Sequence, residues 1–102
     1  MVESNVMQLM KIIGDPTRVK LIHALLKKPQ YISELARSTN LDRGTVTYNL
    51  ALIESIDILN SKYKILESPH SKGKAAKVYS INTANLKKSL DILTKTLNTL
   101  KP

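Results

Sequence analysis

Cysteine, phenylalanine and tryptophan are absent from this sequence of 102 residues, and four tyrosines are its only aromatic side chains. Without cysteine the chain can form no disulfide and can offer no thiolate to a soft metal ion. Its core must therefore be built from leucine, isoleucine and valine, which is feasible because 42% of the residues are apolar. No apolar run approaches the roughly 20 residues that a membrane span requires, and the first residues lack the apolar block of a signal peptide. These absences predict one cytoplasmic domain over residues 1–102, with no membrane partner.

Basic residues outnumber acidic ones by 16 to 8, which gives a net charge of +8. Half of this excess lies between residues 62 and 77, where five lysines face Glu67 alone, a net +4. The five are Lys62, Lys64, Lys72, Lys74 and Lys77. Such a segment suits a polyphosphate partner, because each neutralised phosphate releases counterions. Lysines also serve solubility on an ordinary solvated surface, so charge alone does not decide between these two interpretations.

Residues 31–59 have the pattern of two short helices joined by a tight turn. The first covers residues 32–39, and Asn40 follows it, a residue that tolerates the left-handed backbone that ends many helices. The second, over residues 42–56, begins at Asp42, whose carboxylate can accept hydrogen bonds from the first turn. Its apolar stripe is Val46, Leu50 and Ile53. At about 100° per residue, the opposite face presents Arg43, Gly44, Thr47, Tyr48 and Ala51, with Thr45 in the flanking first turn. We therefore predict a helix-turn-helix whose second helix is free to bind a partner.

Two further helices are expected before this motif. Residues 3–13 carry apolar side chains at helical spacing, and Gly14 ends the run. These side chains are Val6, Leu9, Met10 and Ile13. Asp15 followed by Pro16 is a strong helix-start signal, since the missing N–H of proline costs nothing at the first helical position. The buried stripe of this next helix, which ends near residues 27–29, is expected to be Val19, Ile22, Leu25 and Leu26.

After the motif the hydrophobic period changes to two, which predicts strands. Tyr63 and Ile65 alternate with lysines in one segment, and Tyr79 and Ile81 alternate with other residues in the next. A hairpin over about residues 62–82, directly after a helix-turn-helix, is the wing of a winged helix. Its basic tip could contact the backbone beside a groove. Alternatively, the lysines only protect an exposed sheet edge.

Residues 83–100 predict a terminal helix with a leucine seam. The leucines are spaced four, three, four and three residues apart, as in helices that pack on a partner helix. They are Leu86, Leu90, Leu93, Leu97 and Leu100. This helix could instead pack only on its own domain. Because three other helices already surround a small core, we expect a homodimer to which Val6 and Met10 of the first helix also contribute.

Three segments resemble the ArsR-type winged-helix repressors of bacteria and archaea. They are Gly14-Asp15-Pro16-Thr17-Arg18-Val19, Ile32-Ser33-Glu34-Leu35-Ala36 and Thr45-Val46-Thr47-Tyr48-Asn49-Leu50. The order of helices, hairpin and terminal helix is similar as well, so the resemblance covers nearly the whole chain. It implies a mainly α, α+β winged helix-turn-helix fold, a homodimer, a second motif helix in the major groove, and a role as transcriptional repressor. Metal-sensing members use cysteines or His and acidic clusters that this chain lacks, so we expect no metal and no cofactor.

The leading hypothesis is a dimeric DNA-binding regulator. Base edges are expected to meet Arg43, Thr45 and Tyr48, and phosphates are expected to meet Thr47 and Arg18. The complete set of expected DNA contacts is Arg43, Thr45, Thr47, Tyr48, Asn49, Arg18, Lys72, Lys74 and Lys77. An architectural, weakly specific nucleic-acid binder of the same fold is the alternative, since lysines act as point charges. An enzyme is not expected, because the acids and the two histidines are scattered and no nucleotide-binding glycine loop is present.

Overall fold

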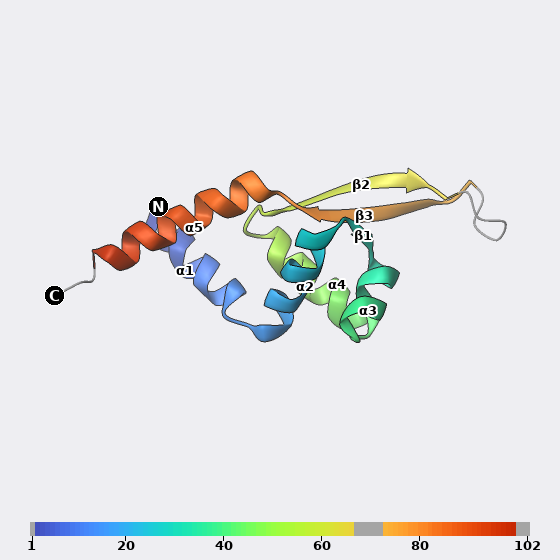
Figure 1. Ribbon diagram of the computed structural model, residues 1–102, viewed down its shortest axis with the longest axis horizontal. Coiled ribbons are helices and arrows are strands. Elements are labelled where there is room, and N and C mark those ends of the chain that lie inside the picture. The colour runs from blue at the N-terminus through green and yellow to red at the C-terminus, as the bar shows by residue number, and fades with distance from the viewer. Residues whose placement is uncertain (1, 67–72, 100–102) are drawn as a thin grey trace.

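A computed structural model describes residues 2–66 and 73–99 (Figure 1). In chain order its elements are α1 (Val2–Ile13), α2 (Pro16–Lys27), β1 (Gln30–Tyr31), α3 (Ile32–Thr39), α4 (Arg43–Glu54), β2 (Leu59–Ile65), β3 (Ala75–Ile81) and α5 (Thr83–Asn98). The strands form one antiparallel sheet in the order β1-β3-β2. The helices α2, α3 and α4 lie below this sheet, α1 and α5 lie together at one end, and the β2–β3 hairpin projects at the other. The predicted α+β winged helix-turn-helix fold is confirmed.

The helix ends follow the local signals in the sequence. Asp15 caps α2 by accepting hydrogen bonds from the backbone N–H groups of Thr17 at 2.8 Å and Arg18 at 3.3 Å. Gly14 is required between α1 and α2, because a Cβ atom there would lie 2.8 Å from the backbone oxygen of Met10. The chain therefore turns here more tightly than any residue with a side chain would allow.

Left-handed backbone ends α3 and the turn after α4. Asn40 has φ 56° and donates its N–H to the carbonyl of Arg37, which confirms the predicted helix end. Asp57 has φ 60° at the position where a glycine would be the easiest residue to accommodate. α4 itself is two residues shorter at its C-terminal end than expected, since it ends at Glu54.

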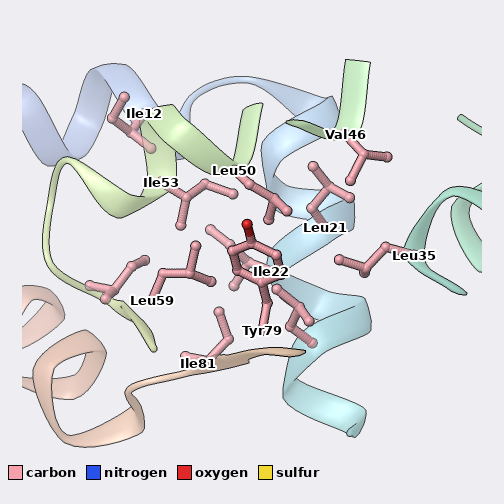
Figure 2. Close-up of a cluster of buried hydrophobic side chains, with 12 residues drawn as sticks. Ile12, Leu21, Ile22, Leu35, Val46, Leu50, Ile53, Leu59, Tyr79 and Ile81 are labelled. Carbon is pink, nitrogen blue, oxygen red and sulfur yellow. The ribbon is translucent and has the colours of Figure 1, made fainter. Parts of the chain in front are cut away.

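The core lies between the helix-turn-helix and the sheet. Figure 2 shows Tyr79 of β3 surrounded by aliphatic side chains from α2, α4 and the neighbouring strands. The completely enclosed side chains are Leu21, Leu35, Val46, Ile53 and Ile58. The expected stripe of α4 is thus confirmed. In α1 the buried side chains are Val6, Leu9 and Ile12, of which Ile12 was not among the expected apolar positions, and Met10 is exposed.

The expected buried stripe of α2 is wrong in two positions. Val19 and Leu26 are both 48% exposed, and Leu21 is buried beside Ile22 and Leu25. Apolar side chains occur on two overlapping faces of this helix, and each face satisfies a helical period. The packing of α2 against α3 and α4 selects one of them, which the helix sequence alone could not do.

The predicted hairpin forms, but its strands begin earlier than expected. β2 starts at Leu59, β3 starts at Ala75, and the two-residue strand β1 gave too short a signal to be predicted. The expected alternation of burial is absent from β2, where Tyr63 is 71% exposed and Ile65 is 63% exposed. The hairpin extends past the helices, so the outer side chains of β2 have little cover (Figure 1). Throughout the described ranges, no helix is long and apolar enough to cross a membrane.

Candidate nucleic-acid interface

One face of α4 is exposed, and its acidic side chain, Glu54, is the last residue of the helix, several turns from Arg43. Arg43, Thr47, Tyr48 and Ala51 are exposed on it. Val46, Leu50 and Ile53 on the opposite face anchor the helix in the core. A rigid helix with this arrangement can present its polar side chains to the edges of base pairs in a major groove.

The start of α4 is held by Asp42. Its carboxylate accepts hydrogen bonds from the backbone N–H of Thr45 at 2.7 Å and from the Thr45 hydroxyl at 2.9 Å. These two bonds stabilise the ionised carboxylate and lower the pKa of Asp42 below its ordinary value. The Thr45 hydroxyl is therefore engaged within the protein as a hydrogen-bond donor.

Asn49 does not lie on the exposed face, contrary to its expected place among the DNA contacts. The side chain is buried, with 6% of its residue surface exposed. It donates from Nδ2 to the carbonyl of Thr45 at 2.8 Å, and its Oδ1 accepts from Nη1 of Arg18 at 3.0 Å. Position 49 shares the spacing of the buried stripe at positions 46, 50 and 53, so the sequence did contain a signal for its burial.

Arg18 is also placed differently from the expectation that it contacts phosphate. Only 13% of its side chain is exposed. Its Nε donates to the carbonyl of Ile12 at 2.7 Å, its Nη2 donates to the carbonyl of Lys11 at 3.3 Å, and Nη1 reaches Asn49. Asp15 adds a longer ion pair at 3.8 Å. The guanidinium therefore connects the end of α1 to α4, and its donors are occupied by the protein itself.

The two faces of the hairpin differ in composition. Residues paired across antiparallel strands lie on the same face, and the register pairs Ser61 with Tyr79 and Tyr63 with Lys77. Because Tyr79 points into the core, Tyr63 and Lys77 continue the side that faces the helices. The Nζ atom of Lys77 lies 5.4 Å from the centre of the Tyr79 ring, a cation–π contact. Of the expected wing lysines, Lys74 is exposed, Lys77 is half-buried, and Lys72 lies outside the described residues.

A cavity of about 400 Å³ separates the start of α4 from the wing. It is lined by the start of α3 at Tyr31 and Ser33, by Arg43 of α4, and by Leu66 and Lys77 of the hairpin. Two of the expected DNA-contacting side chains, Arg43 and Lys77, thus line one hollow although they are 34 residues apart in the sequence. Nothing in the sequence pattern indicated this.

The expected dimerisation residues lie on α1 and α5. Not one residue of α5 is fully buried among those the structure describes, and Leu90 and Leu97 are 41% and 48% exposed. Leu86 and Leu93 are half-buried, and Leu100 lies outside the described residues. Val6 is buried within the protomer, while Met10 is exposed together with Met7. The exposed apolar side chains of these two helices are therefore methionines of α1 and leucines of α5.

Metal-ligating side chains are dispersed. In residues 2–66 and 73–99, no three His, Cys, Asp or Glu side chains come close enough to hold a metal ion. The expectation that the protein takes no metal stays a prediction.

Comparisons with known proteins agree with this geometry. Residues 15–61 match the family described as bacterial regulatory protein, arsR family. A protein of Methanocaldococcus jannaschii, described as an uncharacterized HTH-type transcriptional regulator, is 32% identical over 68 residues, which cover 67% of this chain and 70% of that protein.

Solved structures show the same fold. An ArsR-like transcriptional regulator from a Rhodococcus species superposes with a TM-score of 0.73 at 16% identity, covering 95% of this chain and 83% of the other. A homodimeric winged helix-turn-helix DNA-binding domain from Mycobacterium bovis superposes with a TM-score of 0.65 at 14% identity, covering 96% of this chain and 83% of the other. The family and the fold are those of transcription regulators, not of enzymes.

Proposed function

Because the chain belongs to the ArsR family of winged helix-turn-helix transcriptional regulators, we propose that it is a homodimeric repressor that inserts α4 into the major groove of duplex DNA. The observation that carries this proposal is the exposed face of α4. Arg43, Thr47 and Tyr48 lie there in the first half of the helix, and the buried face fixes the helix to the core. The acid of that face, Glu54, lies at the other end of the helix. A base-reading helix needs both properties, a polar outer face and a rigid support.

The dimer is supported by the uncovered apolar side chains of α1 and α5. Leu90 and Leu97 follow the seam spacing but stay 41% and 48% exposed within the protomer, and Met7 and Met10 are exposed on the neighbouring helix. The related domain from Mycobacterium bovis is homodimeric. Two copies related by a two-fold axis would present two α4 helices and two wings, so the DNA site is expected to be palindromic.

Repression follows from the size of such a complex. A dimer that covers two successive major grooves at a promoter would occupy DNA that a polymerase needs. In a transcription assay with purified components, we therefore expect added protein to lower transcript yield from a promoter that contains the selected site. A promoter with the site scrambled is the matched control, and a raised yield from the intact promoter would identify an activator.

Selection of bound sequences from a random duplex pool tests DNA reading directly. We expect an enriched palindrome whose half-sites are about 10 bp apart, or a multiple of that, centre to centre. The variant with Thr47→Ala and Tyr48→Ala should lose the enrichment and keep its fold, because both side chains are exposed. An enriched sequence without two-fold symmetry would contradict the dimeric mode.

A weakly specific architectural binder remains a second candidate. It is favoured by the single arginine on the exposed face of α4, since lysines act as point charges and carry little sequence information. The two candidates differ in the affinity ratio between a selected and a random duplex at one salt concentration. Specific regulators typically show ratios of about 10³ or more, whereas an architectural protein would show a ratio near one.

A further inference from the structure

The cavity between the recognition helix and the wing contains the elements of an anion site. Its volume of about 400 Å³ has room for roughly a dozen water molecules at about 30 Å³ each, so a phosphodiester group fits inside it. The lining brings one guanidinium from α4 and one ammonium from β3 to a hollow that also holds the hydroxyl-bearing residues Tyr31 and Ser33. The described residues that line it include no acid.

Lys77 is held in place rather than mobile. It is half-buried, and its Nζ atom lies over the Tyr79 ring, whose position in the core is fixed. Its pairing with Tyr63 places it on the side of the hairpin that faces the helices. Lys62 and Lys64 lie at the alternate positions of β2 and therefore on the opposite face. The hairpin thus directs one particular lysine toward the cavity.

Two acids of the described residues lie close in sequence to the lining, and both are engaged, whereas Glu67, which follows Leu66, lies outside the described residues. Glu34 accepts a hydrogen bond from the backbone N–H of Tyr31 at 2.9 Å, and Asp42 accepts from the first turn of α4. Each carboxylate is neutralised in part by the helix start that it caps. Among the described residues that line the cavity, the charged side chains are therefore the two cations Arg43 and Lys77.

We propose that this cavity is a binding site for one DNA backbone phosphate, held jointly by Arg43 and Lys77. The inference rests on the proposed function. A helix in the major groove and a hairpin over the adjacent minor groove are separated by a single sugar–phosphate strand. In the proposed complex that strand would cross the space between α4 and the β2–β3 hairpin, and the cavity is lined by residues of both.

This assignment changes the role of Arg43. Bound to a phosphate, its guanidinium positions the protein on the duplex and carries no sequence information. Base reading then falls to Thr47 and Tyr48, which lie farther along the exposed face of α4. Arg43 was expected to meet a base edge, and in this proposal it binds a phosphate together with Lys77. The shared phosphate then fixes the distance between the recognition helix and the wing.

The salt dependence of DNA binding tests the clamp. Each phosphate contact contributes about 0.9 to the slope of log affinity against log salt for duplex DNA. With two clamps in a dimer, the variant with Arg43→Ala and Lys77→Ala should lose about 1.8 of slope, because the two charges serve one phosphate per protomer. Separate phosphates would give a loss of about 3.6, which would overturn the shared site. Lys62→Ala, on the other face of the hairpin, is the matched control. It should reduce the slope of log affinity against log salt by less than the double variant does.

Arg43→Lys separates a phosphate ligand from a base reader. Lysine keeps the charge but cannot make a bidentate contact with guanine. A phosphate ligand predicts an unchanged slope and a change of less than about twofold in the affinity ratio between selected and scrambled duplexes. Loss of base preference at one position per half-site in this variant would overturn the assignment.

A neutral backbone probe locates the phosphate. A methylphosphonate placed at each position of the selected duplex in turn should weaken binding of the unmodified protein at one backbone position between the two grooves. The double variant should be insensitive at that same position. If the methylphosphonate weakened binding of both proteins equally at every position, the clamp would be overturned and DNA binding would still be established. If the unmodified protein bound no duplex, the proposed function would be overturned as well.

Discussion

Removal of the Arg18 side chain should destabilise the fold without altering the electrostatics of DNA binding. Arg18→Ala takes away the donors to the carbonyl of Ile12 and to Oδ1 of Asn49 and leaves both oxygens without these partners. Hydrogen bonds that involve a charged group contribute about 1.5–3 kcal/mol each, and water that enters the vacated space recovers part of this. We therefore expect the free energy of unfolding to fall by about 2–4 kcal/mol.

Equilibrium unfolding in urea measures this loss. Protein concentration must be held fixed, because unfolding of a dimer depends on it. Arg37→Ala is the control, since Arg37 is exposed and its loss should change stability by less than about 0.5 kcal/mol. An equally small effect for Arg18→Ala would refute its role as a connection between α1 and α4.

The salt slope separates this structural role from the phosphate contact that the sequence suggested. Under conditions where the Arg18→Ala variant is fully folded, its slope of log affinity against log salt should equal that of the unmodified protein. A slope reduced by about 0.9 per protomer would instead show that Arg18 binds phosphate.

Further predictions concern the dimer surface, a glycine pair and a helix cap. Leu90→Glu with Leu97→Glu should yield a folded monomer, because both side chains are exposed in the protomer and a charge at either position would oppose burial between two helices. Sedimentation that shows an unchanged dimer would contradict this. Gly14→Ala should lower the free energy of unfolding by about 1–3 kcal/mol, since the new Cβ atom would lie 2.8 Å from a backbone oxygen. Gly44→Ala, inside α4, would favour the helix but place its Cβ atom 3.3 Å from the capping Oδ1 of Asp42, so thermal unfolding should show a smaller shift than for Gly14→Ala. Because the pKa of Asp42 is lowered, its carboxylate stabilises the folded protein above the ordinary carboxyl pKa, and this stabilisation is lost as the pH falls through the lowered pKa. The difference in the free energy of unfolding between the unmodified protein and Asp42→Asn should therefore become smaller on acidification. A difference that stays constant with pH would argue against the cap.

Much of this protein could be predicted from short stretches of its sequence. Asp15 and Asp42 cap α2 and α4 as expected, and Asn40 ends α3 in the left-handed conformation. Each of these features depends on atoms within three or four residues of one another, so the residue types suffice to specify it. The family resemblance and the winged helix-turn-helix fold rest on the same local patterns in chain order.

Tertiary structure alone decided which side chains meet. Arg18 and Asn49, 31 residues apart, are paired because α2 and α4 pack against each other, and this pairing removes two expected DNA contacts from the surface. Arg43 and Lys77 line one cavity because the hairpin folds back beside the helix-turn-helix. Residue spacing predicts which face of a helix or strand a side chain occupies. It does not predict which distant element covers that face. That depends on how the whole chain closes around its core.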